Sequence, residues 1–158
     1  MMRPTRADCP MCGKIVGISR LLADELVIQL KSSVVLLGPW QYYPGYCVVV
    51  SKSHARELHE LGAEREAFLA DMSRTAQAIV EVFEPLKLNY EMLGNRVEHP
   101  HWHLFPRSAE DANKLAPVWI ELAKADTSPA DKERLMTGPT TRRKTADRLR
   151  EWFAKDKR

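Results

Sequence analysis

Hydrophobic residues follow two different periods along this chain. Between residues 24 and 51 they form short runs rich in β-branched side chains, separated by segments that carry glycine, proline and serine. This arrangement is typical of antiparallel strands joined by short connections. The three strands that it predicts are Leu26–Leu30, Val34–Leu37 and Tyr46–Val50.

The period changes in the middle of the chain. Over Ala63–Phe83 the apolar residues recur at steps of three and four, which predicts a long amphipathic helix covering one face of the sheet. Pro85 cannot continue this helix, because proline has no backbone N–H. Two further strands are predicted, Leu88–Met92 and His99–Phe105.

After Arg107 the pattern becomes helical again. The predicted helices are Pro117–Ala125, Ala130–Met136 and Thr140–Lys155. The last one carries an apolar stripe that is suited to docking on the body or on a second subunit. We therefore expect an α+β domain, residues 1–110, with an antiparallel sheet and a long helix packed on it, followed by a helical C-terminal extension, residues 111–158.

Composition narrows the class of protein. A hydrophobic content of 44% and a charged content of 28% are typical of a soluble globular chain. No apolar run approaches the ~20 residues that cross a bilayer, and the first eight residues lack the apolar core of a secretory signal. We expect a cytoplasmic protein with no membrane partner, in which the three cysteines are reduced thiols.

Positive charge is concentrated at the C-terminus. The whole chain has a net charge of +3, and Thr141–Arg158 carries eight Lys or Arg against three acidic residues. Such a segment can bind nucleic acid or an anionic surface. A solvated face of a terminal helix is the favoured interpretation, so nucleic acid is possible but not favoured as a partner.

Three of the five histidines alternate with other residues at His99, His101 and His103. In a strand this spacing predicts all three on one face, with Trp102 and Leu104 on the other. An unprotonated imidazole can attack phosphorus, and its neighbours can orient it or stabilise the transferred group. The central His101 is the natural nucleophile and His103 the candidate partner for the phosphoryl group. A metal-binding strand or a solvated edge is the alternative.

The run His99–Phe105 fits the pattern His-x-His-x-His followed by two apolar residues, and through it the chain resembles the histidine triad (HIT) family of nucleotide hydrolases and transferases. Tyr43–His54 is similar to the strand that leads into a helix in that family, and Gly94–Val97 to the approach to the triad. The resemblance extends from Cys9 to Arg107.

This resemblance implies a homodimer of antiparallel sheets and a reaction at the α-phosphate of a nucleotide. It implies that His101 forms a nucleotidyl-histidine and that His103 contacts the phosphate. The expected nucleotide-binding residues are Asn89, Gly94, Asn95, Arg96, His101 and His103. Two departures affect substrate contacts: Tyr46 stands where many members have histidine, and Asn95-Arg96 stand where many have glutamine or serine.

Cys9 and Cys12 form a Cys-x-x-Cys pair that we expect on a tight turn. The pair needs two further ligands to close a tetrahedral zinc site. Taken alone, the pair is ambiguous between metal binding, redox chemistry and free thiols. The resemblance implies that His54 and His99 complete a structural Zn²⁺ site. His99 would then be a ligand, which leaves His101 and His103 as the catalytic pair.

The function expected from these residues is hydrolysis of dinucleoside polyphosphates or nucleoside phosphoramidates through a covalent intermediate. In related nucleotidyltransferases and phosphorylases the third triad position is glutamine, so His103 favours hydrolysis. A transferase or phosphorylase remains an alternative. So does a non-catalytic, zinc-stabilised module that binds nucleotides or nucleic acid.

Overall fold

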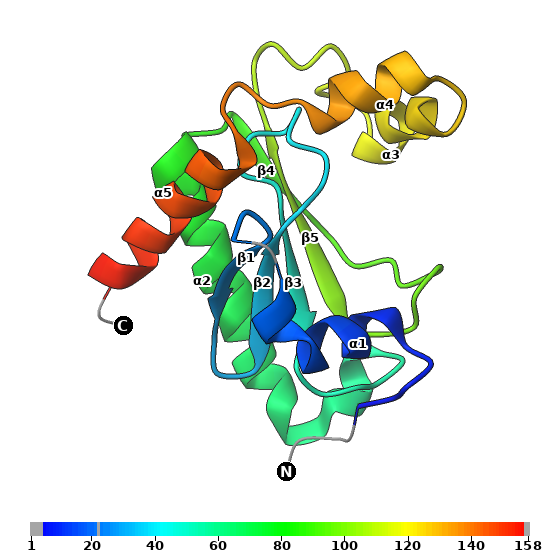
Figure 1. Ribbon diagram of the computed structural model, residues 1–158, viewed down its shortest axis with the longest axis vertical. Helices are drawn as coiled ribbons and strands as arrows, with labels where there is room; N and C mark the ends of the chain where they lie inside the picture. Colours follow the sequence, from blue (N-terminus) through cyan, green and yellow to red (C-terminus); the bar gives the residue numbers. More distant parts are fainter. Residues whose placement is uncertain (1–4, 22, 157–158) are drawn as a thin grey trace.

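The computed structural model describes residues 5–21 and 23–156. Its centre is a five-stranded antiparallel sheet in the order β1-β2-β3-β5-β4 (Figure 1). The strands are β1 (Leu26–Gln29), β2 (Ser33–Leu37), β3 (Cys47–Ser51), β4 (Lys87–Glu91) and β5 (His101–Arg107). The predicted α+β fold is confirmed, and the strand ends lie within two residues of those predicted.

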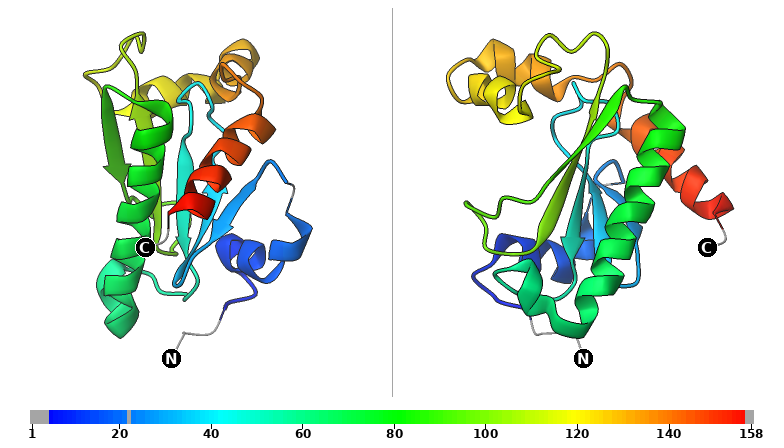
Figure 2. Two further views of the ribbon diagram at one scale, coloured as in Figure 1. Left: turned by 90° about the vertical axis from the view of Figure 1, so that its left-hand side faces the viewer. Right: turned by 180° about the vertical axis from the view of Figure 1, so that it is seen from behind.

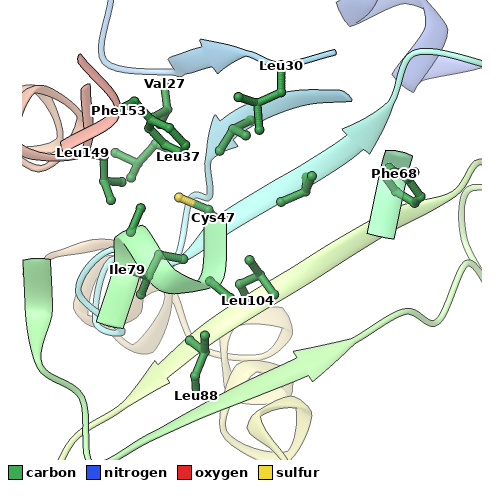
Figure 3. Packing of buried hydrophobic residues seen from close by; sticks show 14 of the residues in the cluster. Val27, Leu30, Leu37, Cys47, Phe68, Ile79, Leu88, Leu104, Leu149 and Phe153 are labelled. Carbon is green, nitrogen blue, oxygen red and sulfur yellow. The ribbon is translucent and has the colours of Figure 1, made fainter. Parts of the chain in front are cut away.

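One face of the sheet is covered by two helices that lie side by side (Figure 2). They are α2 (Arg65–Phe83), which follows the short helix η2 (Leu58–Glu64), and α5 (Arg142–Lys155). Their apolar stripes close a core against the strands (Figure 3), whose members include Val27, Leu37, Cys47, Ile79, Leu104, Leu149 and Phe153. The long helix predicted at Ala63–Phe83 is therefore confirmed, with its apolar period facing the sheet.

The other face is covered at its two ends by separate groups of helices (Figure 1). Towards one end lies α1 (Pro10–Val16), followed by η1 (Ile18–Arg20); towards the other lie α3 (Val118–Leu122), η3 (Ala123–Asp126) and α4 (Pro129–Met136). The tight turn predicted at Cys9–Cys12 is wrong, because the chain enters α1 there. Pro10 occupies the first helical turn, where its missing N–H costs nothing.

The basic helix α5 directs several of its arginines at the body. Arg142 donates to the carbonyl oxygens of Gly38 and Leu37, at 2.7 and 3.2 Å, and Arg148 donates to the Val82 carbonyl at 2.5 Å. Arginines held in this way cover the ends of β2 and α2 with charge-assisted hydrogen bonds. The extension packs on α2 and β1, and the division of the chain near residue 110 stays a prediction.

None of the helices within the described ranges combines the length and the apolar character that a membrane crossing requires.

Candidate functional site

The triad histidines sit where β5 begins. Pro100 has no N–H to donate to the sheet, so β5 starts at His101 and pairs with β3 through His101 and Val50. Within the strand the alternation holds: His103 and Phe105 belong to one face, and Trp102 and Leu104 to the core under α2. The prediction that all three histidines are strand residues is wrong for His99, which precedes the strand.

The side chain of His99 instead joins the two cysteines. The ligand atoms of Cys9, Cys12, His54 and His99 all lie within 4.8 Å of one another, so this group could hold a metal ion. Sulfur–nitrogen separations are 3.5 Å for Cys9–His99, 3.4 Å for Cys12–His54 and 3.6 Å for Cys12–His99. The two imidazole Nδ1 atoms are 3.3 Å apart.

These separations fit a tetrahedral zinc ion. Zn–S bonds of about 2.3 Å and Zn–N bonds of about 2.0–2.1 Å at tetrahedral angles place sulfur and nitrogen about 3.6 Å apart, and two nitrogens about 3.3 Å apart. His99 Nε2 lies 2.7 Å from the Ser51 carbonyl oxygen, which orients the ring and leaves Nδ1 available to a metal ion. Burial lowers the pKa of His99, which favours the uncharged imidazole that a ligand requires.

The backbone of His99 orients the next histidine. His101 is 6% exposed, and its Nδ1 lies 2.6 Å from the His99 carbonyl oxygen. A carbonyl can only accept, so Nδ1 carries a proton, and in the uncharged ring the lone pair is on Nε2. His99 thus contributes its ring to the metal group formed by Cys9, Cys12, His54 and His99. Its carbonyl oxygen orients His101.

His101 lines a cavity of about 460 Å³ between α1, α3 and the loop that precedes β5. The lining includes His101 and His103, the loop residues Leu93, Gly94, Asn95, Arg96 and Val97, and Met11, Trp40, Trp119, Leu122, Ala123 and Asp126. Five of the six predicted nucleotide-binding residues therefore meet in one cavity. The sixth, Asn89, does not line it, and its amide oxygen accepts from the buried Arg107 at 2.8 Å.

His103 is enclosed by aromatic rings. Its Nδ1 lies 2.7 Å from the Tyr46 hydroxyl, its ring is stacked with Phe105, and the ring of Trp119 meets it edge-on at 5.2 Å between centroids. This burial lowers the pKa of the His103 imidazole to about 4, and the neighbouring His101 adds to the shift. His103 is accordingly uncharged at neutral pH.

Sequence reasoning missed the wall that the C-terminal extension contributes. Trp119 in α3 faces His103 and donates its indole N–H to Glu91 on β4. Nothing in the local pattern around Trp119 indicates this contact, since it joins residues in different parts of the chain. Tyr46 was visible as a departure from the resembled pattern, but its hydrogen bond to His103 was not.

A sequence model of the HIT domain matches residues 21–110, more than half of the chain. The chain belongs to the HIT domain family. As a HIT protein it is a member of a family that binds and processes nucleotides, and the resemblance read from the triad is confirmed.

Solved structures share the HIT fold. A HIT-like protein from Bartonella henselae, described as involved in cell-cycle regulation, has a TM-score of 0.62 at 15% identity, covering 94% of this chain and 98% of its own. A Zn-bound histidine triad family protein from Mycobacterium smegmatis has 0.63 at 19%, covering 93% and 94%. A histidine triad protein from Marinobacter aquaeolei has 0.56 at 28%, covering 74% and 95%. No protein with a curated description matches this chain.

Proposed function

We propose that this HIT protein is a hydrolase that cleaves nucleotides at the α-phosphate through a covalent nucleotidyl-histidine on His101. The observation that supports this most strongly is the 2.6 Å contact between His101 Nδ1 and the His99 carbonyl oxygen. In the uncharged ring this contact leaves the lone pair on Nε2, and His101 lines a cavity wide enough for part of a nucleotide. The proposed substrates are dinucleoside polyphosphates or nucleoside phosphoramidates.

In the proposed reaction, the lone pair of His101 Nε2 forms a bond to the α-phosphorus while the bond to the leaving group breaks. Water then attacks the same phosphorus and loses a proton to the solvent, and the bond to Nε2 breaks with its electron pair returning to the ring. Gly94, Asn95 and Arg96 would contact the phosphates from the loop. His103 would donate a hydrogen bond to the phosphoryl oxygens as negative charge develops on them.

We propose Zn²⁺ as the ion held by Cys9, Cys12, His54 and His99. Four protein ligands close the coordination shell, so the metal would be structural. It would tie α1 to the segment before β5 and hold His99, whose carbonyl oxygen orients His101.

We also propose a homodimer in the cytoplasm. Strand β4 is at the edge of the sheet. Tyr90 within it and Leu86 just before it are 48% and 66% exposed, which suits pairing with a second copy. No disulfide joins Cys9, Cys12 or Cys47, which suits a reducing compartment. Nucleic acid is not the favoured partner, because arginines of α5 are engaged with the body.

Mass spectrometry of the protein mixed with diadenosine tetraphosphate tests the function. A nucleotidyl adduct on His101, and turnover that is lost in His101→Ala while metal content is retained, are the expected results. Turnover in His101→Ala would show that the nucleophile is misassigned. Formation of ADP only when inorganic phosphate is added would identify a phosphorylase in place of a hydrolase.

A further inference from the structure

Tyr46 is a buried neighbour of His103 and lies behind the wall of the cavity. It is 2% exposed, and its ring is stacked on Phe105 at 3.9 Å between centroids and 10° between planes. Gly38 lies directly against the ring: a Cβ at that position would come within 2.1 Å of a ring carbon. Packing on both sides therefore holds the Tyr46 hydroxyl at one place, 2.7 Å from His103 Nδ1.

This hydrogen bond determines where His103 carries its proton. Among the described residues, Nδ1 of His103 is the one hydrogen-bond partner of the Tyr46 hydroxyl. Burial raises the pKa of Tyr46 far above its ordinary value, so the phenol stays protonated. A buried O–H with one acceptor in reach donates to it. Nδ1 therefore accepts, and in uncharged His103 the proton is on Nε2.

The surroundings of His103 also oppose a second proton. Phe105 and Trp119 pack against the ring and partly desolvate it, and His101 would repel a positive charge beside it. Glu91 is the acidic residue on the Trp119 side of His103, and it accepts a hydrogen bond from the Trp119 indole N–H. Burial raises the pKa of Glu91. Arg96 and Asp126 lie at the cavity and are 3.9 Å from each other.

We propose that Tyr46 is a positioning residue that holds His103 as an uncharged Nε2–H donor, and that the site therefore favours leaving groups that depart as stable anions over leaving groups that must first take a proton. This inference rests on the proposed function. It selects nucleoside polyphosphates, in which another phosphate is expelled, over nucleoside phosphoramidates, in which an amine is expelled.

The first step balances without proton transfer for a polyphosphate. The Nε2 lone pair of His101 forms the N–P bond, the bridging P–O bond breaks, and its electron pair leaves on a phosphate oxygen whose conjugate acid has a pKa near ~6. His103 keeps its proton throughout and donates a hydrogen bond to the phosphoryl oxygens.

A phosphoramidate requires more from the site. The electron pair of the broken P–N bond would leave on nitrogen, which is far too basic to depart without a proton. His103 could supply its Nε2 proton only by taking the Tyr46 proton at Nδ1. That transfer would leave a phenolate in a buried position, where burial strongly disfavours the charge.

Nitrogen NMR of the histidine rings tests the protonation state without relying on turnover. In the full-length protein, His103 should show the neutral Nε2–H pattern from about pH 8 down to about pH 5. Tyr46→Phe removes the donor and should produce a mixture of the two neutral tautomers. Tyr43→Phe is the matched control, since Tyr43 also packs on Phe105, but its buried hydroxyl has no hydrogen-bond partner in the described structure.

Steady-state kinetics with diadenosine tetraphosphate and adenosine 5′-phosphoramidate test the predicted preference for polyphosphates. The unaltered protein should have a kcat/KM at least about tenfold higher for the polyphosphate. Tyr46→Phe should lower kcat for it by about 10- to 100-fold, as loss of an outer hydrogen-bond partner typically does, with little change in KM. Tyr43→Phe should change neither constant by more than about twofold.

An imidazolium signal from His103 at about pH 6, or faster turnover of the phosphoramidate, would overturn the inference. Equal kinetics in Tyr46→Phe and Tyr43→Phe would remove the positioning role. The absence of both turnover and a His101 adduct would instead overturn the proposed function and the substrate preference with it. The NMR result would still decide the protonation of His103.

Discussion

Burial of uncharged His103 predicts a specific loss of stability in mild acid. The pKa of His103 is lowered from 6.5 to about 4 in the folded protein, while the unfolded chain keeps the ordinary value. Between these two values the unfolded state binds the proton and the folded state does not. The stability that depends on uncharged His103 is therefore fully present above pH 6.5 and is lost as the pH falls towards 4. Lowering the pH from about 7.5 to about 5.0 should reduce the free energy of unfolding by about 2 kcal/mol through this one group.

Urea unfolding at these two pH values measures the effect, with His103→Gln as the reference. Glutamine cannot be protonated, so the variant should lose about 2 kcal/mol less than the unaltered protein between the two conditions. Other acid-sensitive groups, including the metal ligands, are shared by both proteins and cancel in the difference. Equal losses in the two proteins would refute the reasoning, since His103 would then titrate normally in the folded state.

Three further predictions concern the core, the metal group and the wall of the cavity. Leu149→Ala should lower the free energy of unfolding by about 2–5 kcal/mol in urea, because Leu149 is 1% exposed; a loss below about 1 kcal/mol would mean that α5 is not docked. Cys12→Ser should lower both the bound zinc, measured by elemental analysis, and the melting temperature, and a chelator should then have little further effect on it. Trp119→Ala should admit water to His103 and raise its pKa towards 6.5 by NMR titration, whereas an unchanged pKa would show that this ring does not shield it.

The order of strands and helices could be predicted because each depends on nearby residues. Each β-branched run before residue 51 encodes one strand. The three-and-four spacing of Ala63–Phe83 encodes one helix and the face that this helix buries. Errors occurred where one residue overrides its neighbours. Pro100 delays β5 until His101, and Pro10 opens a helix where a turn was predicted.

The site was predictable to the extent that it is encoded in one short segment. Alternation along β5 sets His103 on a different face from Trp102, and this follows from strand geometry alone. The metal group differs, since α1, the segment after β3 and the segment before β5 each supply part of it. Only the resemblance to a family pointed to His54 and His99 as partners of the cysteines.

The sequence by itself determined the sheet, the long helix and the histidine spacing, because these follow from contacts and periods within a few residues. Only the tertiary structure decided what each histidine does. The ring of His99 turns to Cys9 and Cys12 while its carbonyl oxygen orients His101. His103 contacts Tyr46, which directly precedes β3, and Trp119 in the C-terminal extension. These contacts, rather than the position of His103 in the motif, keep its imidazole uncharged.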